Sequence, residues 1–222
     1  TLAELAAAIG RPFDLDLLLH ANDGGETETM AALDELWQRR ILREQPTAAA
    51  SFERYDFTHE KLREVVYGAI SAPRRRLLHH RIAEALAVSH AGSLDQIGAE
   101  LAAHYDAAGQ VERAIHFYAQ ACEVAESLYA LDDALRWTQR ALILLEQQPV
   151  GELRDRTELR FLLALARIYR ITRGWADHEL EAVLERAQSL CVAVGDSVQR
   201  SQVLYGLQSV YVVQARHDDV HK

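Results

Sequence analysis

The sequence predicts an all-α protein, and three observations support that fold class. Glycine and proline are scarce, with 11 and 4 residues among 222, so few positions break a helix. Apolar residues recur three or four positions apart along most of the chain, which is the spacing of one helix face. The breaks between these stretches are short, as at Gly109-Gln110 and Asp132-Asp133, and this favours antiparallel neighbouring helices.

Residues 1–72 are predicted to form three short helices followed by a small β-hairpin. The first two predicted helices are residues 2–9 and 13–20, and the third contains residues 30–37. Two strands are expected at Ile41-Leu42 and at residues 55–58, on either side of a polar, alanine-rich loop at 45–54. Helix, helix, helix and hairpin is the order of elements in a winged helix-turn-helix domain.

Every later pattern is helical. Residues 73–92 are predicted to form a bridging helix, with Pro73 in its first turn, where proline is tolerated. Residues 93–222 read as a series of amphipathic helices with short connections. Such a series predicts helical hairpins stacked as a solenoid.

The clearest internal unit lies at residues 101–121 and has the spacing of a tetratricopeptide repeat. Small residues at its helix contacts let two antiparallel helices approach closely, and aromatic residues fill the space between hairpins. The predicted packing residues of this unit are Leu101, Ala102, Tyr105, Gly109, Ala114, Tyr118 and Ala121. A weaker second instance contains Ala134 and Ala141, and it begins 20 residues after Ala114 rather than 34.

Three stretches also resemble one protein family. FTHEKLREVVYGAISAPRRRLLHHRIAEAL (57–86) resembles the segment that links the ATPase module to helical repeats in large bacterial signal-transduction ATPases of the STAND class. LAAHYDAAGQVERAIHFYAQACEVAE (101–126) and RITRGWADHELEAVLERAQSLCVAVGD (170–196) are similar to the repeat region of that family, and residues 1–44 to its winged-helix element. These regulators carry LuxR-type DNA-binding or adenylate-cyclase domains at one end.

The resemblance implies a regulatory segment without its ATPase module. The sequence has no GxxxxGK[ST] motif, so it cannot form the phosphate-binding loop itself. ATP or ADP is therefore implied only for a longer parent protein, and the expected partners are a protein or peptide, including the parent's own ATPase module. The family likeness also assigns His59 by position as a sensor that contacts the phosphates of ADP. The alternative is that His59 caps the following helix or packs at the base of the wing.

Charge separates the chain into an acidic start, a basic stretch and an acidic remainder, with a net charge of −9. The basic stretch, 61–81, contains Arg74, Arg75 and Arg76, which either pair with acidic neighbours or dock on an acidic surface. The third predicted helix begins with Glu26 and Glu28, which would repel DNA phosphates. The sequence therefore disfavours nucleic-acid binding through this segment.

No catalytic or metal-binding constellation stands out, so we expect a non-enzymatic protein without a metal or cofactor of its own. Cys122 and Cys191 lie inside apolar helical patterns and are expected to be buried thiols, which indicates the cytoplasm. No apolar run approaches the ~20 residues that cross a bilayer, so no membrane partner is expected. The predicted function is a partner- or effector-binding surface in a signalling or transcriptional regulator. Two alternatives stay open: a DNA-binding winged-helix fragment and a small-molecule-sensing repeat domain.

Overall fold

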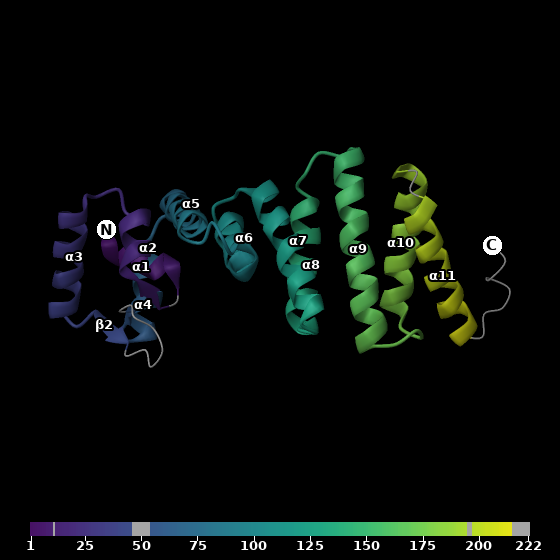
Figure 1. Cartoon of the computed structure of the whole chain (residues 1–222), viewed down its shortest axis with the longest axis horizontal. Helices are drawn as coiled ribbons and strands as arrows, with labels where there is room; N and C mark the ends of the chain where they lie inside the picture. The colour runs from purple at the N-terminus through teal and green to yellow at the C-terminus, as the bar shows by residue number, and fades with distance from the viewer. Residues whose placement is uncertain (11, 46–53, 195–196, 215–222) are drawn as a thin grey trace. The chain divides into compact units, whose positions relative to one another are not determined.

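The computed structural model describes residues 1–10, 12–45, 54–194 and 197–214 (Figure 1). Within these ranges the chain forms eleven α-helices, one short 3₁₀ helix and three short strands. The prediction of a predominantly helical protein is confirmed. The chain separates into two compact units, 1–114 and 115–222, and the boundary between them falls inside helix α7 (Val111–Ser127).

The first unit begins with three short helices. These are α1 (Leu2–Ile9), α2 (Leu15–Ala21) and α3 (Glu26–Gln38). The hydroxyl of Thr1 accepts a hydrogen bond from the amide of Glu4 and so caps the start of α1. The helix ends at Gly10, whose φ of 75° is left-handed and favours a residue without a Cβ atom.

A three-stranded antiparallel sheet accompanies these helices, in the order β1-β3-β2. Its strands are β1 (Phe13–Asp14), β2 (Leu42–Gln45) and β3 (Arg54–Phe57). The prediction that Phe13 belongs to the second helix is wrong. The carboxylate of Asp14 accepts a 2.8 Å hydrogen bond from the amide of Leu17, so Asp14 is the N-cap and α2 begins one residue later. Phe13 stays extended and pairs with Tyr55.

The two predicted strands pair with each other as expected, although their bounds are shifted. Leu42 lies opposite Phe57, and the pairing continues to Gln45 opposite Arg54. Ile41 precedes β2, and its carbonyl accepts a hydrogen bond from the amide of Thr58. The loop predicted between the strands falls largely at residues 46–53, outside the described residues.

A long helix joins the elements of the first unit. This helix, α5 (Ala72–Ser89), follows α4 (Glu60–Ala69) and precedes a 3₁₀ turn (Leu94–Ile97) and α6 (Gly98–Ala107). It packs against α1, α2 and α6, and its central residues Ile82 and Ala83 have no exposed surface. Pro73 lies in its first turn, where the missing amide costs nothing.

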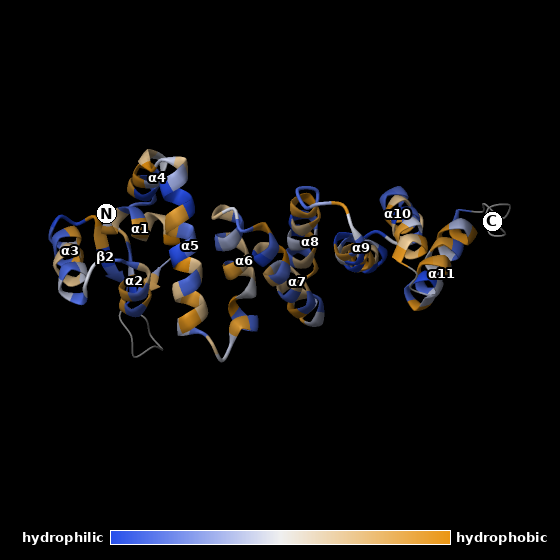
Figure 2. Ribbon diagram, turned by 90° about the horizontal axis from the view of Figure 1, so that it is seen from above, coloured by the Kyte–Doolittle hydropathy of each residue, from blue (hydrophilic) through white to orange (hydrophobic). Residues whose placement is uncertain are grey.

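The second unit is a run of helical hairpins. After the rest of α7 come α8 (Leu131–Leu145), α9 (Glu152–Thr172), α10 (His178–Val194) and α11 (Ser197–Val213). Helix α9 packs against both α8 and α10, and α10 packs against α11. Figure 2 shows α9 nearly end-on, with α8 and α10 on either side of it. No helix in the described part of the chain combines the length and apolarity needed to cross a membrane.

The core of the second unit is apolar and comes mostly from α9, α10 and α11. Its fully or nearly fully buried members include Leu159, Leu180, Leu184, Ala187, Cys191, Val203 and Val210. Gly206 is also buried, on the face of α11 that meets α10. A Cβ atom at Gly206 would lie 3.1 Å from both terminal methyl carbons of Leu184, so this glycine sets the spacing of the two helices.

We expect Gly206→Leu to lower the free energy of unfolding by about 1–3 kcal/mol, because the larger side chain overpacks the contact with Leu184. Gly68→Ala is the matched control. Gly68 lies inside α4, and a Cβ atom there would have nothing within 4 Å, so alanine should raise stability by about 0.5–1 kcal/mol. Urea denaturation monitored by circular dichroism measures both. Equal effects at the two sites would contradict the assigned packing of α11 on α10.

Candidate functional site

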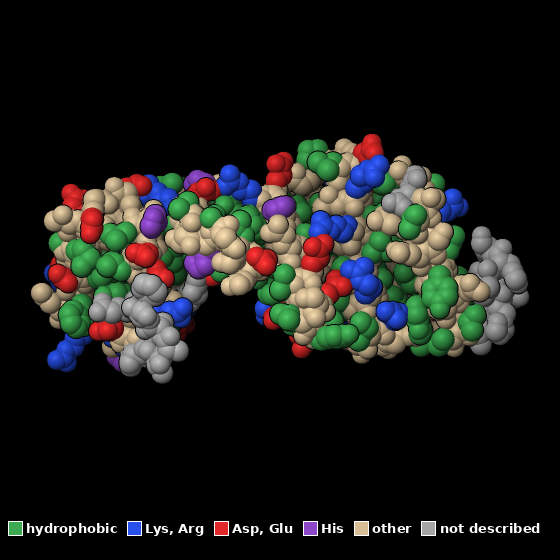
Figure 3. All heavy atoms as spheres, in the orientation of Figure 1, with side chains coloured by type: hydrophobic (Ala, Val, Ile, Leu, Met, Phe, Trp, Pro, Cys, Tyr) green, Lys and Arg blue, Asp and Glu red, His purple; other side chains and the backbone are tan. Residues whose placement is uncertain are grey.

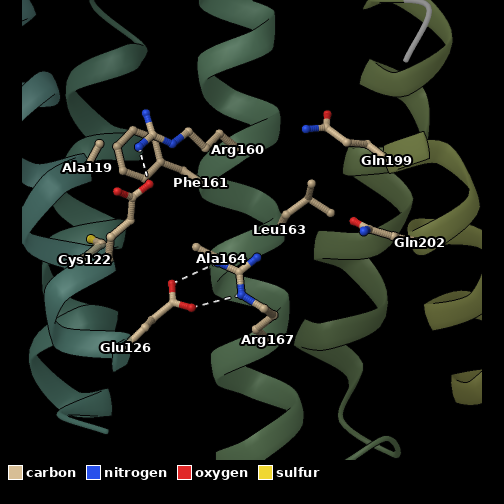
Figure 4. Close-up of a pocket in the computed structure, with 11 residues that line it drawn as sticks. Ala119, Cys122, Glu126, Arg160, Phe161, Leu163, Ala164, Arg167, Gln199 and Gln202 are labelled. Carbon is tan, nitrogen blue, oxygen red and sulfur yellow. Dashed lines mark hydrogen bonds and ion pairs between the residues drawn. The ribbon is translucent and has the colours of Figure 1, made fainter. Parts of the chain in front are cut away.

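A hollow lies on the second unit, where three alternate helices, α7, α9 and α11, present side chains to one space (Figure 4). It has a volume of about 200 Å³. We call it the α7–α9–α11 groove. Its lining residues are Ala119, Cys122, Glu123, Glu126, Arg160, Phe161, Leu163, Ala164, Arg167, Gln199 and Gln202.

Two ion pairs join α7 to α9 in this groove. Arg160 pairs with Glu123, and Arg167 forms a two-pronged contact with Glu126 at 2.9 and 3.1 Å. The arginines are seven residues apart and therefore lie on the same face of α9. Because the arginines are about half exposed, each pair contributes only about 0–1 kcal/mol to stability. A bound partner could therefore exchange with either pair at little cost to the fold.

The rest of the groove combines an apolar base with uncharged polar groups. Phe161 and Ala164 of α9 are almost fully buried beneath it. Gln199 and Gln202 extend from α11 towards α9 (Figure 4). A carboxamide both donates and accepts hydrogen bonds, as a peptide bond does. The lining therefore suits a polypeptide better than a strongly charged ligand.

The groove does not contain a reactive thiol. Cys122 is 3% exposed, and its sulfur lies 3.3 Å from the hydroxyl of Thr138. Burial is the main cause that raises the pKa of the Cys122 thiol, so little thiolate forms near neutral pH. In the described ranges no group of three or more His, Cys, Asp or Glu side chains could hold a metal ion.

The surface of the second unit mixes both signs of charge. Figure 3 shows Lys or Arg and Asp or Glu side chains interspersed over α7 and α9. Outside the groove, Arg186 of α10 forms the same type of pair with Glu158 of α9, at 2.7 and 3.1 Å. Its side chain is 52% exposed, the same fraction as that of Arg167.

The predicted repeat-packing residues are all placed in the structure. Eight of them are at most 6% exposed: Leu101, Ala102, Tyr105, Ala114, Tyr118, Ala121, Ala134 and Ala141. Gly109 ends the turn after α6 with a φ of 78°, a left-handed conformation that explains the choice of glycine. The hydroxyl of Tyr105 donates to Glu84 of α5 at 3.2 Å, so α6 is joined to α5 by a polar contact as well.

The predicted arginine cluster does not form one basic patch. Arg74 pairs with Glu4 of α1. Arg75 donates to the carbonyl of Ile70 at 2.8 Å and lies over the ring of Tyr67. Arg76 is exposed and makes no ion pair among the described residues. Two of the three arginines therefore hold α5 against its neighbours.

His59 is exposed at the start of α4. It is the N-cap residue of that helix, but its side chain makes no capping hydrogen bond. The acidic start of α3 is also exposed, with Glu26 and Glu28 in its first turn. At the other end of α3, Arg39 pairs with Glu35 of the same helix.

Sequence reasoning missed the groove itself. Its polar residues come from positions 123 to 202, and nothing in a single sequence shows that α7, α9 and α11 share one face. A signal was nevertheless present. Glu123 and Glu126 repeat at three residues and Arg160 and Arg167 at seven, so each pair of like charges lies along one helix face.

Known proteins offer little likeness to this chain. No known family profile matches the chain, and no solved structure matches it. It is 26% identical over 187 residues to "Uncharacterized protein R02095" of Rhizobium meliloti (strain 1021). The match covers 84% of this chain and 18% of that protein, so the chain spans less than a fifth of its relative.

We expect the native protein to show almost no reaction with a thiol reagent such as DTNB at pH 8, because both cysteines are buried. After unfolding in guanidinium, two thiols should react. Absorbance at 412 nm counts them in each state. Rapid labelling of the native protein would show that at least one of the two thiols is accessible to solvent.

Proposed function

We propose that this chain is a non-enzymatic regulatory and protein-interaction segment of a multidomain bacterial ATP-dependent signalling or transcriptional regulator. The observation that carries the proposal is the α7–α9–α11 groove, which gathers polar side chains from three helices that are not consecutive in the chain. Stacked helical hairpins use such surfaces to bind partners.

The lining indicates the kind of partner. Two arginines and two glutamates give the groove no net charge, and two glutamines add carboxamides above an apolar base. A protein or peptide segment, with backbone amides and mixed side chains, matches that combination. In this proposal the partner includes the parent protein's own ATPase module.

The finer fold assignment belongs to the same proposal. Three helices with a three-stranded antiparallel sheet in the first unit support a winged-helix element. The buried small and aromatic residues of 101–121 support a tetratricopeptide-like hairpin. The match to only 18% of a longer relative supports a segment of a multidomain protein.

The two alternatives have less support. DNA binding would need basic side chains at the start of a recognition helix, whereas α3 begins with Glu26 and Glu28. Small-molecule sites commonly enclose about 300–1,000 Å³. The groove, at about 200 Å³, is smaller and open on one side. Salt-dependent gel shifts of duplex DNA and a thermal-shift screen with metabolites test these alternatives directly.

Substituting one groove arginine tests the proposed function. We expect Arg167→Ala to weaken binding of this chain to the separately expressed remainder of its parent protein by about tenfold or more. That loss corresponds to one hydrogen bond with a charged group. Isothermal titration calorimetry gives the Kd.

Arg186→Ala is the matched control, since it removes an ion pair of the same type and exposure outside the groove. The free energy of unfolding of both variants should lie within about 1 kcal/mol of that of the unsubstituted protein. The control should bind within about twofold of it. Equal losses in both variants, or no binding to the remainder of the parent by any variant, would contradict the proposal.

His59 is proposed as a nucleotide sensor of the parent protein. Because its side chain is exposed and does not cap α4, we expect His59→Ala to change the stability of this chain by less than about 0.5 kcal/mol. In the full-length parent the same change should speed ADP release and raise basal activity. A stability loss above about 2 kcal/mol with unchanged ADP retention would instead assign His59 a structural role.

A further inference from the structure

Two histidines face each other in the interior of the first unit, where three helices meet. His79 of α5 and His104 of α6 are 7% and 6% exposed. Their Nδ1 atoms are 2.9 Å apart, which is a hydrogen-bond distance. On the other side of the ring, Nε2 of His79 lies 2.9 Å from the hydroxyl of Tyr67 on α4. One imidazole therefore connects α4, α5 and α6.

This geometry limits the number of protons that the pair can hold. A hydrogen bond between two Nδ1 atoms needs one donor and one acceptor, so only one of the two atoms carries a proton. Two charged imidazoles would each present a donor and could not bond to each other. The closed arrangement therefore accepts at most one extra proton, whereas two separated, hydrated histidines accept two.

The surroundings of His79 oppose even that single charge. From α4 it faces Tyr67, from α6 His104, and on its own helix Arg75, which lies 4.9 Å over the Tyr67 ring. Burial first, and then the charge of Arg75, lower the pKa of His79 below its ordinary value.

Several other charged groups on the helices around this site are engaged in ion pairs of their own. On α4, Arg63 pairs with Glu60 and Lys61 with Glu64, and on α5 Arg76 is exposed. Glu4 of α1 pairs with Arg74, and Asp23, in the turn after α2, pairs with Arg81. One turn further along α5, Glu84 pairs with Arg113. On α6 itself, Glu100 lies one helical turn before His104. The charge that acts on the pKa of His79 is that of Arg75.

We propose that the Tyr67–His79–His104 cluster is a proton-sensitive latch, which holds α4, α5 and α6 together when the pair is neutral and releases them when both imidazoles are protonated. On release, α4 and α6 separate from α5 at the cluster, whereas α5 keeps its apolar packing on α1 and α2. The inference does not depend on the proposed function, because it concerns a different unit of the chain.

The direction of the pH effect follows from the lowered pKa. The open form takes up protons as the pH falls through the ordinary histidine value of about 6.5, and the closed form takes up fewer. The stability of the closed form relative to the open form is therefore greatest above about pH 7 and decreases below pH 6.5. For one histidine that titrates only when open, a change from pH 7 to pH 5 raises the open-to-closed ratio about 25-fold.

Hydrogen–deuterium exchange of the whole chain at pH 7 and pH 5 tests the latch, after correction for the intrinsic exchange rate at each pH. Amides of α4 and α6 should lose about 25-fold or more of their protection at pH 5, and amides of α9 should lose much less. His79→Gln and His104→Gln remove the titration and keep a hydrogen-bonding side chain, and each is compared with itself at the two pH values. Neither should show the pH-dependent loss.

His116→Gln is the control, because His116 is exposed on α7. It should behave as the unsubstituted protein does. The proposal is wrong if α4 and α6 keep their protection at pH 5, if all helices lose protection together, or if both glutamine variants retain the loss. A titration of the imidazole signals by NMR is independent of the variants. It should show that His79 and His104 are not both charged under any condition in which the amides of α4 and α6 are still protected from exchange.

Discussion

Close approach between neighbouring helices is the constraint on which the other features depend. Four alanines have no exposed surface: Ala102, Ala114, Ala134 and Ala141. A Cβ atom added at Gly206 would lie only 3.1 Å from the methyl groups of Leu184. Side chains this small allow helix axes to lie near the short end of the usual 8–10 Å range. Because the packing faces are apolar and small, the polar side chains of each helix are left on its other faces. The groove and the arginine–glutamate pairs occupy those faces.

Because apolar packing stabilises the fold, the ion pairs of the groove can be broken at little cost in stability. Burial of Leu159, Phe161 and Ile168 holds α9 in place, at about 25 cal/mol for each Å² of apolar surface removed from water. The Arg160–Glu123 and Arg167–Glu126 pairs lie on the exposed side and add little to that. In the proposed function, these pairs fix where charge lies on the surface and so which partner fits. Affinity for a partner and stability of the fold can then change independently.

The parts of this structure that local patterns determine could be predicted, and the parts that long-range contacts determine could not. Helical periodicity and scarce glycine placed the helices. Phe13 was assigned wrongly because one hydrogen bond, from the amide of Leu17 to Asp14, moves the helix start past it. Adjacent residues of a helix point to different faces, and on α5 His79 is buried whereas the His80 side chain is about 40% exposed. That His79 would meet His104, 25 residues later, depends on how α5 packs on α6, which a single sequence does not contain.

The two units differ in the chemistry of their buried polar side chains. Burial of a polar group costs free energy unless the group is hydrogen-bonded, and each unit contains one buried pair of side chains within hydrogen-bond distance. In the second unit the pair is Cys122 with Thr138, and the raised pKa of the thiol keeps it neutral throughout the physiological range. In the first unit the pair is His79 with His104, whose ordinary pKa falls inside that range. The ion pairs of the groove are instead weakened by salt, since exposed charges are screened within about 8–10 Å. Protons therefore act on a buried pair of the first unit, whereas salt acts on exposed ion pairs, among them those of the groove.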